Sequence, residues 1–308
     1  MLIQEPPAEL GGGVWMLGTK AYPLYLIRAQ GEAAIVEGGI SALGPVLQTQ
    51  LAELGVGPAD VRQAIITHAH PDHVMAIPCL RAMFPELSVA ASAAAATTLG
   101  VEKAVAFFRQ VDSALTDVLR KAGAIGPDAV LAPVEENRIA IDRTLREGDC
   151  VTVGDRTWSV LETPGHSDCS ISLHEPASGV LIISDATGYL LPAGDAWWPN
   201  YFTGYGIYVR SIERLAALDA EIVCLSHNGA VCGREAVHAY FAGALESTRQ
   251  YHQRIVDEAK AGKPARQIAE ELGAEIHRQT PVLPVDFFQK NCALMIKQSL
   301  KHEGIAPA

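Results

Sequence analysis

The sequence predicts an α/β fold. Short apolar runs that suit strands alternate with longer stretches whose apolar residues recur at helical spacing, and turn residues separate them. The chain has 308 residues, of which 49% are hydrophobic and 19% are charged. This length and composition suit a globular α/β domain with an appendage and exclude a disordered chain.

The N-terminal part predicts a β-hairpin followed by a helix. Residues 24–27 and 33–36 are apolar runs on either side of a glycine-containing turn, which is typical of a hairpin. Residues 43–54 then carry apolar side chains at helical spacing. These elements lead into a short apolar run at 64–66, which we interpret as a buried strand.

That strand ends in an unusual cluster, Thr67-His68-Ala69-His70-Pro71-Asp72-His73. Three imidazoles and a carboxylate are hard to explain as packing, because each would need its own buried partner, whereas they are typical metal ligands. In an extended segment His68 and His70 point the same way and can bind one ion. Asp72 and His73 follow the bend at Pro71 and can face a second ion. The alternative is a loop of solvated histidines.

The pattern His-x-His-x-Asp-His after an apolar strand resembles the signature of the metallo-β-lactamase superfamily. The resemblance implies a four-layer αβ/βα sandwich and three further ligands, each near the end of an apolar run: His166 in Thr163-Pro164-Gly165-His166, Asp185 in Ile182-Ile183-Ser184-Asp185, and His227 in Cys224-Leu225-Ser226-His227. It implies that His68, His70 and His166 bind a first ion, that Asp72, His73 and His227 bind a second, and that Asp185 bridges them. The expected cofactors are two divalent ions, with zinc favoured and iron or manganese as alternatives.

Further pieces resemble one subgroup, the quinolone-signal response proteins, which have acyl-thioesterase activity. They are Val36-Glu37-Gly38-Gly39-Ile40-Ser41, Ile65-Ile66-Thr67-His68, Gly165-His166-Ser167-Asp168, a helical insertion, and Val285-Asp286-Phe287 in a helical tail. Many relatives carry Asp where Glu37 stands, so Glu37 is either a carboxylate that supports a metal ligand or a solvated turn residue.

We expect residues 1–233 to form the catalytic domain, with a helical insertion at about 92–135, and residues 234–308 to form a helical C-terminal extension packed on it. Within the insertion, a stripe at helical spacing either contacts the core or covers the mouth of the site. The stripe comprises Phe107, Phe108, Val111, Leu115 and Leu119.

Aromatic residues crowd the segment after Asp185, together with glycines and prolines. This composition is expected of a substrate pocket wall, of an oligomer surface or of a roof over the sandwich. The candidate substrate contacts are Trp197, Trp198, Tyr201, Phe202, Phe107 and Phe287. A helix is expected over residues 212–218, before the apolar run that leads to His227.

The formal net charge of −11 would repel phosphate backbones, so we expect no nucleic-acid partner. Residues 1–7 lack the features of a secretion signal, no apolar run approaches a membrane span, and six cysteines are scattered without CxxC spacing. We therefore expect a cytoplasmic protein with reduced cysteines, no membrane partner and a small-molecule substrate; an oligomer stays open. Cys169, three residues after His166, either packs near the metal site or touches it.

The resemblance implies a dinuclear hydrolase in which a hydroxide shared by two ions attacks a carbonyl or phosphoryl centre. Asp72 or Asp185 would take up the proton, and Tyr189 would donate to the leaving group or to the oxyanion, as a tyrosine does in lactone-cleaving relatives. A thioester, another small ester or a lactone is the favoured substrate. The alternatives are a phosphodiesterase of the same fold and a metal-bearing regulatory or interaction protein whose hydrolysis is incidental. Diiron redox chemistry is disfavoured, because iron flavoproteins of this superfamily usually carry Glu where His70 stands.

Overall fold

A computed structural model of the chain describes residues 1–127, 137–194 and 196–306 and divides it into two compact units. Unit 1 comprises Met1–Glu162, Cys169–Ser184 and Ala220–Gly233, and unit 2 comprises Thr163–Asp168, Asp185–Asp219 and Arg234–Ala308. Two internal segments, residues 163–168 and 185–219, belong to unit 2 together with the C-terminal helices. The chain enters unit 2 for the last time after residue 233. Residues 128–136 of the predicted insertion lie outside the described residues.

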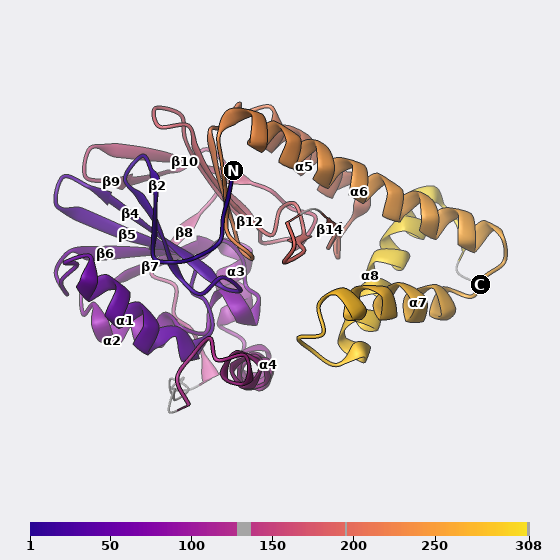
Figure 1. The fold of residues 1–308 in the computed structure, drawn as a ribbon, viewed down its shortest axis with the longest axis horizontal. Helices are drawn as coiled ribbons and strands as arrows, with labels where there is room; N and C mark the ends of the chain where they lie inside the picture. The colour runs from indigo at the N-terminus through magenta and orange to yellow at the C-terminus, as the bar shows by residue number, and fades with distance from the viewer. Residues whose placement is uncertain (128–136, 195, 307–308) are drawn as a thin grey trace. The chain divides into compact units, whose positions relative to one another are not determined.

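Two seven-stranded sheets form the centre of unit 1, in the part of the chain that the structure describes (Figure 1). The first has the order β1 (Leu2–Ile3), β16 (Ala230–Cys232), β15 (Ile222–Leu225), β12 (Val180–Ser184), β11 (Ile171–Glu175), β10 (Arg156–Glu162) and β9 (Cys150–Val153). The second has the order β2 (Ala8–Gly11), β3 (Val14–Gly18), β4 (Pro23–Ala29), β5 (Glu32–Val36), β6 (Val61–Ile65), β7 (Ser88–Ser92) and β8 (Arg143–Leu145).

The second sheet brings functional loops to one edge. The predicted hairpin is confirmed, with β4 and β5 antiparallel. Strands β5, β6 and β7 are parallel, with Val36 opposite Ile65 and Ile65 opposite Ala90. Because parallel neighbours end at the same edge of a sheet, the loops that carry Glu37 and His68 begin side by side.

The two sheets share one apolar core. Trp158 and Val160 of the first sheet belong to the same buried cluster as Met16 and Ile27 of the second. Tyr25 joins the sheets by a polar contact, since its hydroxyl donates to the carbonyl oxygens of Leu225 at 2.5 Å and of Gly229 at 3.0 Å. This core is continuous from β3 to β15 and supports the strand ends where the candidate ligands lie.

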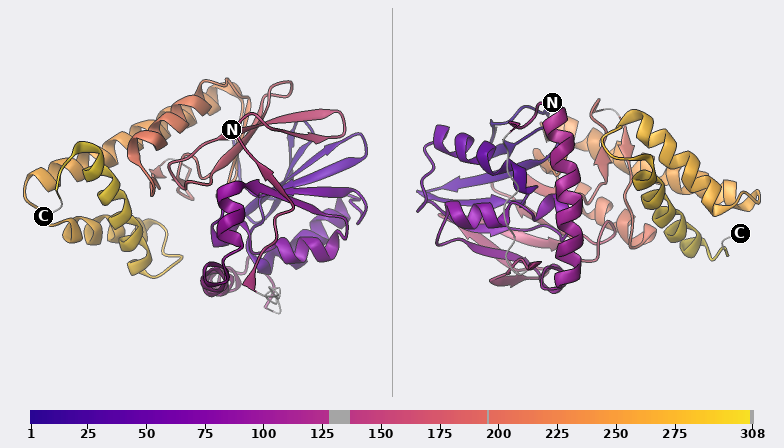
Figure 2. Two further views of the ribbon diagram at one scale, coloured as in Figure 1. Left: turned by 180° about the vertical axis from the view of Figure 1, so that it is seen from behind. Right: turned by 90° about the horizontal axis from the view of Figure 1, so that it is seen from below.

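In the described residues, unit 1 also contains the helices η1 (Ser41–Leu43), α1 (Gly44–Glu53), η2 (Pro71–His73), α2 (Ile77–Met83), α3 (Ala93–Leu99) and α4 (Glu102–Lys121). Helix α1 confirms the predicted helix at 43–54. Helix α4, the long magenta helix of Figure 2, packs against η1 and η2. Its buried face includes Phe108, Leu115 and Leu119, whereas Phe107 is 58% exposed. The prediction that Phe107 shares the apolar stripe is therefore wrong: it lies one position away from Phe108 and about 100° around the helix.

Unit 2 consists of a small hairpin and four helices in the described residues: β13 (Tyr189–Leu190), β14 (Trp197–Trp198), α5 (Tyr205–Ala216), α6 (Arg234–Lys260), α7 (Ala265–Gln279) and α8 (Val285–Glu303). Helices α7 and α8 pack closely, and Gly273 allows this because a Cβ there would lie 2.6 Å from the backbone nitrogen of Gln289. Helix α5 begins at Tyr205 rather than near the predicted residue 212, and Tyr208 in its first turns is buried. No helix in the described part of the chain is long and apolar enough to span a membrane.

Candidate metal centre

His68 and His70 form a pair after β6 in unit 1. His68 Nε2 lies 3.0 Å from His70 Nδ1. The other ring nitrogen of His68 lies 3.2 Å from the Thr67 hydroxyl and 3.3 Å from the Ser184 hydroxyl. The backbone of this loop is fixed as well, because Ile171 N donates to Thr67 O at 2.9 Å. The predicted common direction of His68 and His70 is therefore present in the structure.

Asp72, His73 and His227 form a second group, which lies entirely in unit 1. Each offers a ligand atom within 4.8 Å of the others. Asp72 Oδ2 lies 3.5 Å from His73 Nε2 and 3.4 Å from His227 Nε2. His227 Nδ1 donates to the carbonyl oxygen of Ala21 at 2.8 Å. A carboxylate and two imidazoles that converge in this way suit a divalent cation.

The carboxylate of Glu37 contacts Nδ1 of His73, the ring nitrogen opposite the one that faces Asp72. Its Oε2 lies 3.0 Å from His73 Nδ1, and its Oε1 accepts from the Thr67 hydroxyl at 2.8 Å. Glu37 is buried, which excludes a solvated turn residue, and its backbone has φ of 80°, an uncommon conformation for a side-chain-bearing residue. Of the two interpretations of Glu37, the structure supports the carboxylate that orients a candidate ligand.

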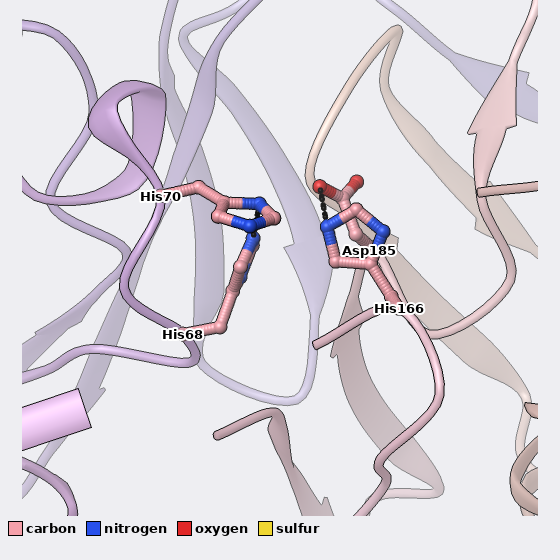
Figure 3. Close-up of side chains that lie close together, drawn as sticks. All are labelled: His68, His70, His166 and Asp185. Atoms are coloured by element: carbon pink, nitrogen blue, oxygen red, sulfur yellow. Dashed lines mark hydrogen bonds and ion pairs between the residues drawn. The ribbon is translucent and has the colours of Figure 1, made fainter. Parts of the chain in front are cut away.

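His166 and Asp185 form a pair in unit 2. His166 Nε2 lies 3.3 Å from Asp185 Oδ2, and His166 Nδ1 donates to the Asn200 carbonyl oxygen at 3.0 Å. Both side chains are buried. Figure 3 shows this pair and the His68–His70 pair with their dashed contacts.

For three of the five histidines, hydrogen bonds fix which ring nitrogen can face a metal. A carbonyl oxygen only accepts, so Nδ1 of His166 and of His227 carries the hydrogen, and Nε2 keeps its lone pair. The carboxylate of Glu37 has the same effect on His73. Metal-binding histidines are usually held by an acceptor on the far side of the ring, so these side chains fit a metal centre.

The ionisation state of Asp72 also suits a metal ligand. Burial alone would raise the pKa of its carboxyl group, but His73 and His227 outweigh it through charge and hydrogen bonding. The pKa of Asp72 is held well below its usual range. The carboxylate is therefore ionised at neutral pH, as a metal ligand must be.

The predicted catalytic and substrate residues occupy varied surroundings. Tyr189 is half-buried and pairs with Trp198 in the β13–β14 hairpin. Trp198 and Tyr201 are buried, Trp197 and Phe202 are half-buried, and Phe287 is 36% exposed. Their roles in catalysis and substrate binding stay predictions.

Two of the supporting residues, Asn200 and Ala21, escape a sequence-based prediction. Asn200 and Ala21 act through backbone carbonyl oxygens, for which the side chain carries no signal. Thr67 lies inside the histidine motif and was detectable by its position alone. Cys169 packs beside the site, since its Sγ accepts from Ala69 N at 3.3 Å.

Comparison with known proteins gives a consistent result. The family model of the metallo-beta-lactamase superfamily matches residues 21–227. The acyl-coenzyme A thioesterase MBLAC2 of Gallus gallus is 27% identical over 223 residues, which cover 68% of this chain and 74% of that protein. The hydroxyacylglutathione hydrolase of Erythrobacter litoralis is 31% identical over 128 residues, or 40% of this chain and 47% of that protein. That of Fuscovulum blasticum is 29% identical, over 65% of this chain and 59% of that protein, so the match spans less than two thirds of both hydrolases.

The structural comparison concerns the fold. A metallo-beta-lactamase family protein from Thermus thermophilus superposes with a TM-score of 0.65 at 22% identity, covering 96% of this chain and 95% of that chain. The subclass B3 metallo-beta-lactamase BJP-1 of Bradyrhizobium japonicum gives a TM-score of 0.57 at 17% identity, covering 82% and 95%. The predicted fold, α/β with two sheets and a helical C-terminal region, is confirmed.

Proposed function

This chain belongs to the metallo-beta-lactamase superfamily, and we propose that it is a dinuclear metal-dependent hydrolase of a thioester or another small ester or lactone. The proposal rests on one observation: side chains that can bind metal are held in fixed orientations. Asp72, His73 and His227 converge within one unit, and each histidine ring is held by an oxygen on its far side. Metal-binding histidines are usually held in this way, and a carboxylate that converges with two such rings suits a divalent cation.

The proposal assigns seven ligands to two divalent ions, zinc being favoured and iron or manganese the alternatives. One ion would be bound by His68, His70 and His166. The other would be bound by Asp72, His73 and His227, and Asp185 would bind both ions. Within each unit, the distances between neighbouring donors support this division: 3.0 Å for His68 with His70 and 3.3 Å for His166 with Asp185. Bound divalent ions lower the pKa of water toward about 7 and polarise a carbonyl oxygen.

The chain's own residues would orient the reactants. Asp72 is ionised at neutral pH and can accept a hydrogen bond from the attacking water. Asp185 would share that task. Tyr189, half-buried at the start of β13, would donate a proton to the leaving group.

The substrate class rests on the relatives and on the chemistry of the side chains. Two kinds of relative are named for hydrolysis of acyl conjugates, of coenzyme A and of glutathione. The half-buried rings of Trp197 and Phe202 suit an apolar acyl group. Arg210 and Arg214 are exposed on α5, and guanidinium groups suit a phosphorylated thiol carrier. Arg234 forms an ion pair with Asp219.

A metal analysis combined with a substrate screen tests the proposal. The purified protein is assayed on acyl thioesters, lactones and phosphodiesters, before and after removal of metal by a chelator and again after metal is restored. We expect thioester or lactone hydrolysis that disappears with the metal and returns with it. Cleavage of phosphodiesters alone would contradict the proposed thioester, ester or lactone substrate and would favour a phosphodiesterase of the same fold.

A protein that holds its full metal complement but hydrolyses none of these substrates would contradict the enzymatic proposal. It would favour a regulatory role, and a pull-down that compares the wild type with a His68→Ala, His70→Ala double variant would then identify metal-dependent partners.

A further inference from the structure

The C-terminal helix α8 holds the segment that follows β14. Gln298 Nε2 donates to the Phe202 carbonyl oxygen at 2.8 Å. The next residue, Ser299, is fully buried and its hydroxyl lies 2.9 Å from the hydroxyl of Tyr201, also fully buried. Two consecutive residues of α8 therefore bind two consecutive residues of the segment.

The same segment, residues 200–203, surrounds His166. The Asn200 carbonyl oxygen accepts from His166 Nδ1 at 3.0 Å and from Phe202 N at 3.1 Å. The Phe202 ring lies against the imidazole, with centroids 5.2 Å apart. Thr203 donates to the carbonyl oxygen of Gly165 from its backbone nitrogen at 3.0 Å and from its hydroxyl at 3.1 Å. The ring nitrogen, the ring face and the preceding peptide of His166 are thus all held by residues 200–203.

We propose that Gln298 and Ser299 are positioning residues for the metal ligand His166. The connection runs from α8 through Phe202 and Tyr201 to Asn200, whose carbonyl oxygen sets the direction of the imidazole. All of these contacts lie within unit 2. The helical extension is then part of the metal centre's support and not only an appendage to the sandwich.

The inference rests on the proposed function, because it requires His166 to bind metal. Loss of a group that orients a metal-binding histidine typically lowers metal affinity by about 10–100-fold. Gln298 and Ser299 act one contact further out, so we expect a loss near the lower limit, about tenfold, when both bonds are removed. A purely structural role would lower the unfolding temperature and leave metal affinity unchanged.

The test uses the full-length protein with Gln298→Ala and Ser299→Ala, singly and together. Metal affinity is measured by competition with a chromophoric chelator, and the absorption spectrum of the Co²⁺ form reports the ligand geometry. Ser247→Ala is the matched control, because Ser247 donates a similar bond to Trp197 O at 3.0 Å, away from residues 200–203. Gln267→Ala, on the exposed face of α7, controls for the change of Gln to Ala.

We expect the double variant to bind the ion assigned to His166 about tenfold less tightly and to show an altered Co²⁺ spectrum, with both controls unchanged. Gln298→Glu is a second variant for the case in which the double variant does not fold. It keeps the shape of a half-buried side chain but removes the donor, so it should weaken binding in the same direction.

A wild type that binds metal with variants that bind it equally well and give the same spectrum would overturn this inference alone. A wild type that binds no metal would overturn both this inference and the proposed function.

Discussion

Glu37 Oε2 lies 3.0 Å from His73 Nδ1, and both side chains are only 2% exposed. The other oxygen of Glu37 accepts from Thr67, the residue that precedes His68. One buried carboxylate therefore supports the histidine motif at two points. Many relatives carry Asp at this position, and Asp is one methylene shorter than Glu. The longer side chain of Glu37 and its uncommon backbone conformation together determine the distance between its carboxylate and His73.

Glu37→Gln should weaken metal binding by about 10–100-fold. Thr67 donates to one oxygen and His73 faces the other, so an amide can accept from only one of them and presents its NH₂ group to the second. Competitive metal titration measures the effect, with Glu53→Gln on the exposed surface of α1 as the control. Equal affinities of the Glu37 variant and the wild type would show that the contact does not orient a ligand.

Gly165→Ala should destabilise the loop that carries His166. Gly165 has φ of +132°, and a Cβ there would lie 2.4 Å from Tyr208 Cα. Backbone cannot yield as a flexible side chain can, so we expect a loss of about 1–3 kcal/mol in unfolding free energy together with weaker metal binding. Denaturant unfolding checks this. Gly55→Ala, with φ of +66° and nothing within 4 Å, separates backbone strain from the collision; equal losses in the two variants would rule the collision out.

Asp112 predicts a pH-dependent stability. Burial raises the pKa of this carboxyl group above its ordinary value of 3.8, although hydrogen bonds from the Ser41 nitrogen and hydroxyl act in the opposite direction. A raised native pKa gives a stabilising contribution that is complete below the unfolded value and is lost as pH rises through the native one.

Relative to Asp112→Asn, the wild type should therefore lose stability as pH rises from about 3.8 to above the raised pKa. Unfolding free energies of the chelator-treated proteins across this range provide the measurement. A stability difference that stays constant, or that moves in favour of the wild type, would mean that the native pKa is not raised.

Much of the fold was predictable because local signals and tertiary structure agree. The hairpin of β4 and β5 and the strand before His68 follow from apolar runs and turn residues. The start of α5 was not, because Gly204 and Gly206 flank its first residue and suggest a loop. The first three strands were also missed, since β1 and β2 are short and glycines end β2 and β3 and fill the turn between them.

Part of the candidate site was likewise predictable from the sequence, and part was not. Ligand types and their order can be seen in the sequence, since histidine and aspartate have few other reasons to cluster. Whether Glu37 was buried or solvated could not be decided there, and the contacts of Asn200 and Gln298 depend on backbone atoms and partners that are 34 and 96 residues distant in the chain.

The central claim is that the seven donors bind two ions on which hydrolysis depends, and Asp185→Asn tests it most directly. Metal content and turnover of a cleaved substrate are measured on the same preparations of wild type and variant. Loss of a direct ligand should lower metal affinity at least as much as loss of a supporting group, by about tenfold or more, so we expect bound metal and turnover to fall together. Full occupancy with unchanged turnover in the Asp185→Asn variant would contradict the claim.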